Sequence, residues 1–179
     1  MIEQPLPRRP DTSDPSRSRH RALKVLFSAD LRREDARIVM DGILVDPEAM
    51  ALLDEVDLDD LDLIAQDRTA ASALLARPGA SRRMDGYAQR LVVGVAEHLD
   101  ELDEHIRTHA KGWRLERMPL VDRNLLRMSI YEMLHEGVKA AIVIDEAVEM
   151  AKELSSDEAP RFVNGVLEAV RREQAAATA

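Results

Sequence analysis

The sequence predicts an all-α protein, and three observations carry this prediction. Aromatic residues make up only 3% of the 179 residues, with 7 Gly and 8 Pro, a composition that disfavours β-sandwiches and β-barrels. Hydrophobic residues recur every three or four positions along most of the chain, as they do on one face of a helix. We find neither the two-residue alternation of a strand nor an internal repeat nor a βαβ pattern.

Residues 1–15 differ from the rest, because four prolines stand among Arg, Asp and Ser. Such a segment has little to bury, so we expect a disordered basic arm. A single helical domain then follows over 16–173, and its first helix is predicted over 16–31 with Ser16 as the N-cap. The apolar face of this helix is formed by Leu23, Leu26, Phe27 and Leu31.

The later helices are predicted from the same spacing, and Pro and Gly indicate their ends. Gly112 ends a long helix, and Pro119 is well placed in the first turn of the next one. The last helix begins between Ser156 and Pro160 and ends near Glu173, before an Ala-rich tail over 174–179 that we expect to be frayed. The other predicted helices cover 34–41, 47–55, 58–77, 85–110, 119–136 and 141–154.

The charge is segregated along the chain. The net charge is −9, yet the stretch from Asp30 to Asp67 alone holds 13 acidic and 3 basic residues, so the remainder is close to neutral. A cluster without any acid lies in the first helix and consists of Arg17, Arg19, His20, Arg21 and Lys24. Such a cluster is typical of an RNA-binding helix, and a solvated helix face is the alternative that residue types leave open.

The spacing within this cluster suggests two roles. Arg17, Arg21 and Lys24 recur at i, i+4 and i+7 and share one helical face, which predicts contacts with phosphates. Arg19 lies off that face and is therefore the candidate for a base contact.

Several classes of protein are excluded or disfavoured. The absence of Cys excludes disulfides, thiolate catalysis and Cys-based zinc sites, and it fits a cytoplasmic protein. We find no secretory leader and no apolar run near the roughly 18 residues that cross a bilayer, so no membrane association is expected. Glycine-rich phosphate loops and nucleophile elbows are also missing, so we do not expect an enzyme or a cofactor.

Two patterns could bind metal. Glu132 and His135 have the Glu-x-x-His spacing of di-iron bundles, but the second copy that such a site needs is absent. A stripe of His98, Glu101, His105 and His109 also shares a helix face. Polar helix faces often look like this, so we favour solvated surface and predict no metal site.

Asn164-Gly165 lies inside the last predicted helix, where a Gly costs about 1 kcal/mol relative to Ala. It therefore suggests close approach of a neighbouring helix or of a ligand, and tight helix packing is the favoured explanation.

Together these segments resemble the NusB family of bacterial transcription antitermination factors, most closely its actinobacterial branch. The resemblance covers about 17–33 and 86–172, and it implies a seven-helix fold of two packed subdomains. It is carried by Arg17-Ser-Arg-His-Arg-Ala-Leu-Lys-Val-Leu-Phe-Ser-Ala-Asp-Leu-Arg32, by Arg117-Met-Pro-Leu-Val-Asp-Arg-Asn-Leu-Leu-Arg-Met-Ser-Ile-Tyr-Glu-Met-Leu134, by Val143-Ile-Asp-Glu-Ala-Val-Glu-Met-Ala-Lys-Glu-Leu154 and by Phe162-Val-Asn-Gly-Val-Leu167.

The resemblance implies binding to the boxA element of ribosomal RNA leader transcripts, together with the small-subunit ribosomal protein that acts as NusE and within the RNA polymerase antitermination complex. It places the basic cluster of the first helix on the RNA surface, bordered by Arg161 and Phe162. It also implies that Asp122 and Glu146 face the ribosomal protein. Whether the free protein forms a homodimer stays open.

Two departures from the family pattern stand out. The segment over residues 45–84 is longer and more acidic than usual, and Lys139 stands where the family usually has Pro.

Two other functions are weighed against the RNA-binding adaptor. One is a detached RNA-binding domain of the ribosomal RNA methyltransferase type, although its glycine motif and catalytic Cys are absent. The other is a metal-dependent helical enzyme built on Glu132 and His135.

Overall fold

The computed structural model describes residues 14–45 and 84–178, and in these ranges it contains seven α-helices, one short 3₁₀ helix and no strand, which confirms the all-α prediction. The predicted helices over 47–55 and 58–77 lie outside the described residues, as do most of the N-terminal arm and of the acidic segment. In chain order the elements are α1 (Pro15–Arg32), α2 (Ala36–Val45), α6 (Gly86–Glu97), α7 (Leu99–His109), η1 (Leu115–Arg117), α8 (Leu120–Leu134), α9 (Ala140–Leu154) and α10 (Ala159–Thr178).

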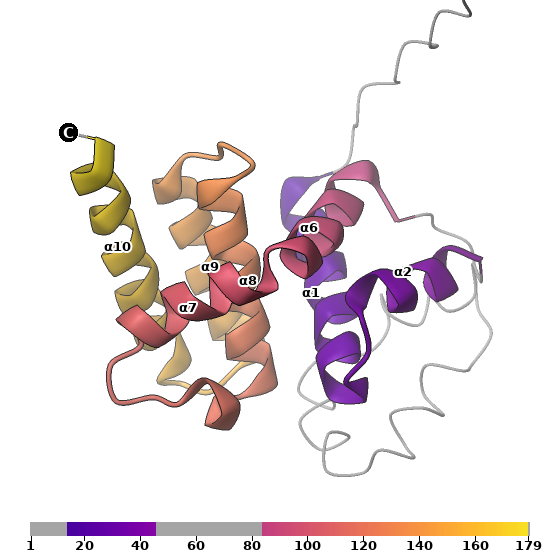
Figure 1. Cartoon of the computed structure of the whole chain (residues 1–179), viewed down its shortest axis with the longest axis horizontal. Helices are drawn as coiled ribbons and strands as arrows, with labels where there is room; N and C mark the ends of the chain where they lie inside the picture. Colours follow the sequence, from indigo (N-terminus) through magenta and orange to yellow (C-terminus); the bar gives the residue numbers. More distant parts are fainter. Residues whose placement is uncertain (1–13, 46–83, 179) are drawn as a thin grey trace, which may run out of the picture.

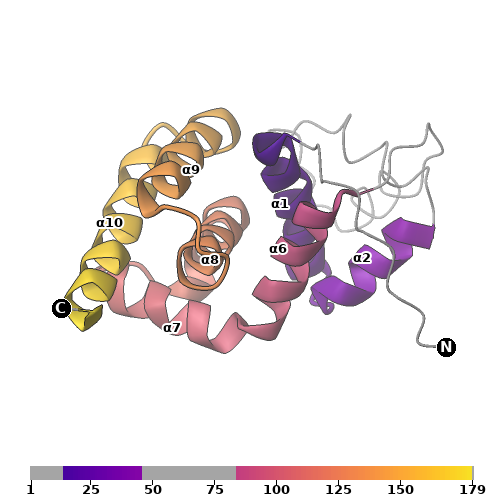
Figure 2. The same ribbon diagram turned by 90° about the horizontal axis from the view of Figure 1, so that it is seen from above.

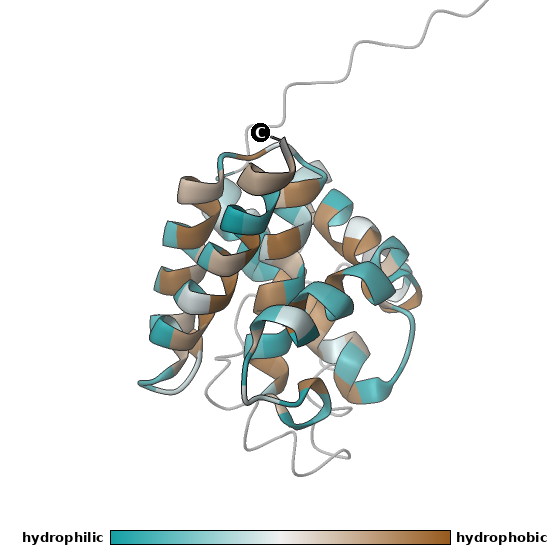
Figure 3. Cartoon of the chain, turned by 60° about the vertical axis from the view of Figure 1, so that its left-hand side comes forward, coloured by the Kyte–Doolittle hydropathy of each residue, from teal (hydrophilic) through white to brown (hydrophobic). Residues whose placement is uncertain are grey.

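The helices form two packed groups (Figures 1 and 2). One group consists of α1, α2 and α6, and the other of α7, α8, α9 and α10. Helix α8 joins the groups, because it packs on α1 and α6 as well as on α7, α9 and α10. Hydrophobic residues lie mainly on the sides of the helices that face one another (Figure 3). No helix among the described residues combines the length and the apolar character needed to cross a membrane.

Helix α1 begins earlier than the sequence suggested. Asp14, not Ser16, is the N-cap, since its carboxylate accepts a hydrogen bond of 3.1 Å from the backbone N–H of Ser16. Pro15 fills the first helical position, where its missing N–H is harmless and its fixed φ suits the helix. Pro15, which the sequence assigns to the arm, is therefore the first residue of the helix.

The long helix predicted over 85–110 is instead two helices, α6 and α7, which meet at His98. His98 leaves the helical conformation with φ −111° and ψ 17°. The reason is tertiary packing: α6 is buried against α1, α2 and α8, whereas α7 packs against α8 and α10. One straight helix could not contact both groups, so the helix axis changes direction at His98. The apolar spacing nevertheless continues across this break.

The remaining boundaries are close to the predictions. Pro119 is the residue before α8, and α9 begins at Ala140. Lys139 has φ −56°, a value that proline would also impose, so its substitution for the family's usual Pro leaves the helix entry unchanged. Helix α10 continues to Thr178, beyond the predicted end near Glu173.

Gly94 allows α6 and α8 to approach closely. A Cβ atom at Gly94 would overlap the ring of Tyr131, which is itself buried in α8. At Gly165, by contrast, nothing lies within 4 Å of the position that a Cβ atom would take, so the tight helix packing favoured there is wrong. The close approach in this fold occurs at a glycine that the sequence analysis did not single out.

Gly94→Ala tests this contact. The added methyl group must displace the Tyr131 ring, and overpacking of this kind destabilises by about 1–3 kcal/mol, despite the higher helix propensity of Ala. Gly42→Ala, in α2 with nothing within 4 Å, is the matched control and should stabilise by up to about 1 kcal/mol. Urea unfolding followed by circular dichroism measures both, and equal effects of the two substitutions would contradict the packing argument.

Candidate nucleic-acid interface

The basic cluster of α1 does not form one exposed surface. Arg19 and Arg21 are buried, with 4% and 6% of their surface exposed. Arg17 is exposed, and His20 and Lys24 are half-buried. The cluster therefore divides into an inner pair of arginines and an outer set of three residues.

Arg19 forms an internal ion pair with Glu132 of α8, whose carboxylate is fully buried. Its Nε lies 3.0 Å from both Glu132 oxygens, and its Nη1 donates to Glu146 of α9 at 3.2 Å. The Tyr87 hydroxyl also donates to Glu132. Burial opposes the charge of Arg19, but its hydrogen bond to Glu132 and the charge of that carboxylate hold the pKa of Arg19 above its usual value. Burial and the same carboxylate raise the pKa of Tyr87.

Arg21 is engaged in a similar way. Its Nη1 lies 3.2 Å from Asp85, and both side chains are nearly inaccessible to solvent. Asp85 is also the N-cap of α6, where it accepts a hydrogen bond of 2.9 Å from the backbone N–H of Ala88. Both guanidinium groups therefore tie helices together in this structure. The base contact expected of Arg19 and the phosphate contact expected of Arg21 stay predictions, and each would require its ion pair to open.

Two of the outer residues can be placed: His20 contacts α9, and Arg17 faces solvent. His20 has its Nδ1 2.9 Å from the carbonyl of Ser16 and its Nε2 3.1 Å from Glu153 of α9. Arg17 occupies the exposed first turn of the helix. A phosphate contact on α1 would therefore fall to Arg17, Lys24 and His20 rather than to the inner arginines.

A groove of about 710 Å³ lies elsewhere, at the start of α10. It contains the predicted residues Arg161 and Phe162, of which Arg161 is exposed and Phe162 half-buried. Trp113 also lines the groove and lies beside Phe162, with its ring centroid 5.3 Å from that of Phe162 and the ring planes at 44°. Gly165 also lines the groove, so the open space at its Cα faces this hollow.

Sequence reasoning missed Trp113. It is the only Trp in the chain, and it lies in a polar loop between Gly112 and Arg114. Gly112 has φ +83°, a left-handed conformation that glycine adopts without strain, and the turn leaves Trp113 49% exposed. An isolated Trp in a basic loop was the signal that could have identified this residue.

The α1 cluster and the groove are not adjacent. Helices α8 and α9 lie between α1 and α10 in both views (Figures 1 and 2). The expectation that Arg161 and Phe162 border the basic surface of α1 is therefore corrected. RNA that contacts both places must cross α8 or α9.

Asp122 and Glu146, the two acidic residues expected to face the protein partner, differ in their exposure to solvent. Asp122 is only 4% exposed and accepts a hydrogen bond of 2.6 Å from the Ser155 hydroxyl, so it ties α8 to the end of α9 at the groove wall. Its expected contact with the protein partner stays a prediction, and only 4% of the residue is accessible for such a contact. Glu146 keeps 34% of its side chain exposed while it pairs with Arg19, and it is flanked on α9 by the exposed Glu149.

Glu132 and His135 do not form a joint ligand pair. Glu132 points into the interior toward Arg19 and Tyr87, whereas His135 is at the end of α8 and lies 3.3 Å from Glu101. The Glu-x-x-His spacing therefore does not create a di-iron half-site, and the structure gives the helical-enzyme alternative no support from these two residues.

The fold is that of bacterial transcription antitermination factors. NusB from T. maritima superimposes on this chain with a TM-score of 0.61 and 28% identity, over 90% of this chain and 92% of that one. A second structure, of the antitermination factors NusB and NusE in complex with double-stranded RNA, has a TM-score of 0.59 at 23% identity and shows the shared fold. The sequence matches the NusB family over residues 47–172, and the chain belongs to this family.

The sequence is also similar to relatives that carry the name transcription antitermination protein NusB. The protein of Acidothermus cellulolyticus is 42% identical over 92% of this chain and 91% of its own length. That of Salinispora arenicola is 40% identical over 84% of this chain and 90% of its own length. The match to the Solibacter usitatus protein is 54% identical but spans only 50% of this chain and 61% of that relative.

The inner and outer residues of the α1 cluster should respond differently to neutralisation. Arg19→Gln leaves the Glu132 carboxylate buried without its main partner, and removal of one partner from a buried pair costs about 3–5 kcal/mol. Arg17→Gln changes only exposed surface and should stay within about 0.5 kcal/mol of the parent protein. Urea unfolding compares the two, and if Arg19→Gln is as stable as Arg17→Gln but binds RNA more weakly, Arg19 is the base contact that the sequence suggested.

Proposed function

We propose that this chain is a non-enzymatic RNA-binding adaptor of transcription antitermination, which binds the boxA element of ribosomal RNA leader transcripts together with the ribosomal protein acting as NusE. The observation that carries the proposal is its membership of the NusB family over residues 47–172. Its relatives named as antitermination proteins match it over most of their length in two cases. The structural neighbour that contains NusB, NusE and double-stranded RNA supports both kinds of partner.

The groove at the start of α10 supports RNA binding by its chemistry. Trp113 and Phe162 offer two aromatic faces within one hollow, and unpaired bases stack on such faces. Lys111 and Arg161 stand at the same groove and can pair with phosphates next to a stacked base. Gly165 leaves space for a base or ribose against the helix backbone.

The charge distribution supports a requirement for a partner. With Arg19 and Arg21 engaged internally, few exposed cations remain on α1, against a net charge of −9. The electrostatic contribution to RNA affinity grows with the number of phosphates neutralised, so it is modest here. Helix α9 exposes Asp145, Glu149 and Glu153 with Glu146 partly exposed beside them, a surface suited to a basic ribosomal protein. Such a partner would extend the cationic surface and carry the assembly to RNA polymerase.

The proposal predicts that RNA binding depends on the ribosomal protein. Gel-shift titration of a boxA RNA should give weak binding by the chain alone and at least about tenfold tighter binding with saturating partner, because the partner adds phosphate contacts. A scrambled RNA of equal length should show a smaller gain. Equal affinity with and without the partner, or equal affinity for both RNAs, would contradict the proposed function.

The aromatic groove makes a separate prediction. Trp113→Ala and Phe162→Ala should each weaken binding to boxA RNA by about 1–3 kcal/mol, the usual loss for one stacked base. Ile38→Ala is the control, since it truncates a large apolar side chain that is 66% exposed on α2. Thermal unfolding accompanies the titrations, because Phe162 also packs partly on the core. If Trp113→Ala keeps full RNA affinity while Phe162→Ala only lowers the melting temperature, the groove is not a stacking site.

A further inference from the structure

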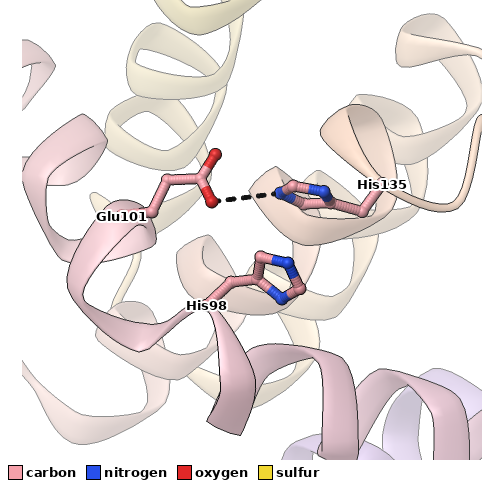
Figure 4. A group of neighbouring side chains, drawn as sticks. All are labelled: His98, Glu101 and His135. Atoms are coloured by element: carbon pink, nitrogen blue, oxygen red, sulfur yellow. Dashed lines mark ion pairs between the residues drawn. The ribbon is translucent and has the colours of Figure 1, made fainter.

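Three side chains from two segments converge beside the junction of α6 and α7 (Figure 4). His98 is the junction residue itself, Glu101 follows in the first turn of α7, and His135 is the C-cap of α8. One ligand atom from each of them lies within 4.8 Å of the other two. In the sequence, His98 and Glu101 are part of a polar stripe on one helix, and only the fold adds His135 to them.

His98 is held in the orientation of a metal ligand. Its Nδ1 lies 2.8 Å from the carbonyl oxygen of Gly94, and since a carbonyl can only accept, this hydrogen bond requires the proton on Nδ1. The neutral ring then carries its lone pair on Nε2. Histidines that bind metals commonly donate the other ring N–H to a backbone carbonyl in this way, which fixes both the tautomer and the ring orientation.

His135 and Glu101 already have the spacing of neighbouring ligands. The Nε2 of His135 lies 3.3 Å from Oε2 of Glu101. Ligand atoms at about 2.0–2.1 Å from a tetrahedral zinc ion are roughly 3.4 Å apart, so this pair could hold an ion with little movement. The His98 ring, whose centroid is 4.1 Å from that of His135, stands beside them.

We propose that His98, Glu101 and His135 form a zinc site, with a water molecule as the fourth ligand. Two imidazoles and one carboxylate form a ligand set that zinc adopts, and imidazole nitrogen favours zinc over magnesium or calcium. The ion would join the start of α7 to the end of α8 and so fix the turn at which the two helix groups meet. Its role is structural, and it is independent of the groove and of the basic cluster of α1.

A second group of the same residue types provides the internal control. His105 and His109 of α7 both contact Oε2 of Glu173 on α10, at 3.3 and 3.0 Å. Among the described residues, neither of these rings donates to a backbone carbonyl as His98 does, so no such bond fixes the tautomer that a metal ligand needs. We therefore place the zinc ion at the first group.

The test is zinc titration of the untagged full chain by calorimetry, with metal analysis after dialysis and thermal unfolding with and without zinc. The parent protein should retain zinc and melt at a higher temperature in its presence, because an ion that binds only the folded state stabilises it. His98→Gln and Glu101→Gln should each lower zinc affinity by at least about tenfold and remove the rise in melting temperature. The double variant His105→Gln/His109→Gln should keep both.

Glu101→Gln distinguishes loss of a zinc ligand from loss of the fold. Because 45% of this side chain is exposed, the substitution should leave the interior intact. Circular dichroism of each variant without zinc confirms that it is folded. Zinc binding that is unchanged by His98→Gln and Glu101→Gln, or no binding by the parent protein at all, would overturn the proposal. Zinc lost only in the His105→Gln/His109→Gln variant would overturn it as well.

Discussion

The buried carboxylate of Glu132 constrains the whole helical assembly. A fully buried charge is tolerated only when it is paired and hydrogen-bonded, and here the partners come from different helices, Arg19 of α1 and Tyr87 of α6. Any shift of α1 or α6 along α8 would break these bonds and leave a charge in the interior. The pair therefore sets the register of three helices, which apolar contacts alone would define less strictly.

A second polar network fixes the other end of the α1–α8 contact. Asp30 near the end of α1 accepts hydrogen bonds from Arg123, Asn124 and Arg127 of α8, and Arg127 continues to Asp103 of α7. The α1 helix is thus held against α8 at two points, about three turns apart in its sequence. The consequence is electrostatic: arginines that serve as internal ties are withdrawn from the surface, so the proposed nucleic-acid contacts rely more on the aromatic side chains and on a partner.

The helices of the described part could be predicted from the sequence because their apolar spacing is local, and α9 was placed to within one residue of its start. The break at His98 could not, since the spacing of Leu91, Val95, Leu102 and Ile106 continues through it, and only packing against two different helix groups turns the axis. The burial of Arg19 could not be predicted either. A basic cluster predicts an exposed side chain, and the Glu132 carboxylate that pairs with Arg19 in the interior lies 113 positions away in the sequence. Of the two aromatic residues in the candidate groove, the sequence motif contained Phe162, but nothing local indicated that Trp113 would lie beside it.

The break at His98, the close approach at Gly94 and the cluster of ligands are parts of one arrangement. Because Gly94 has no side chain, the Tyr131 ring can lie against α6, and the same ring stacks on His135 with centroids 5.4 Å apart. Tyr131 therefore sets the position of His135, while the carbonyl of Gly94 sets that of His98. A glycine in the middle of α6 thus determines where two histidines from different helices stand. A side chain at residue 94 would push the Tyr131 ring away and move His135 from His98, so the proposed zinc site depends on the same close packing that joins the two helix groups.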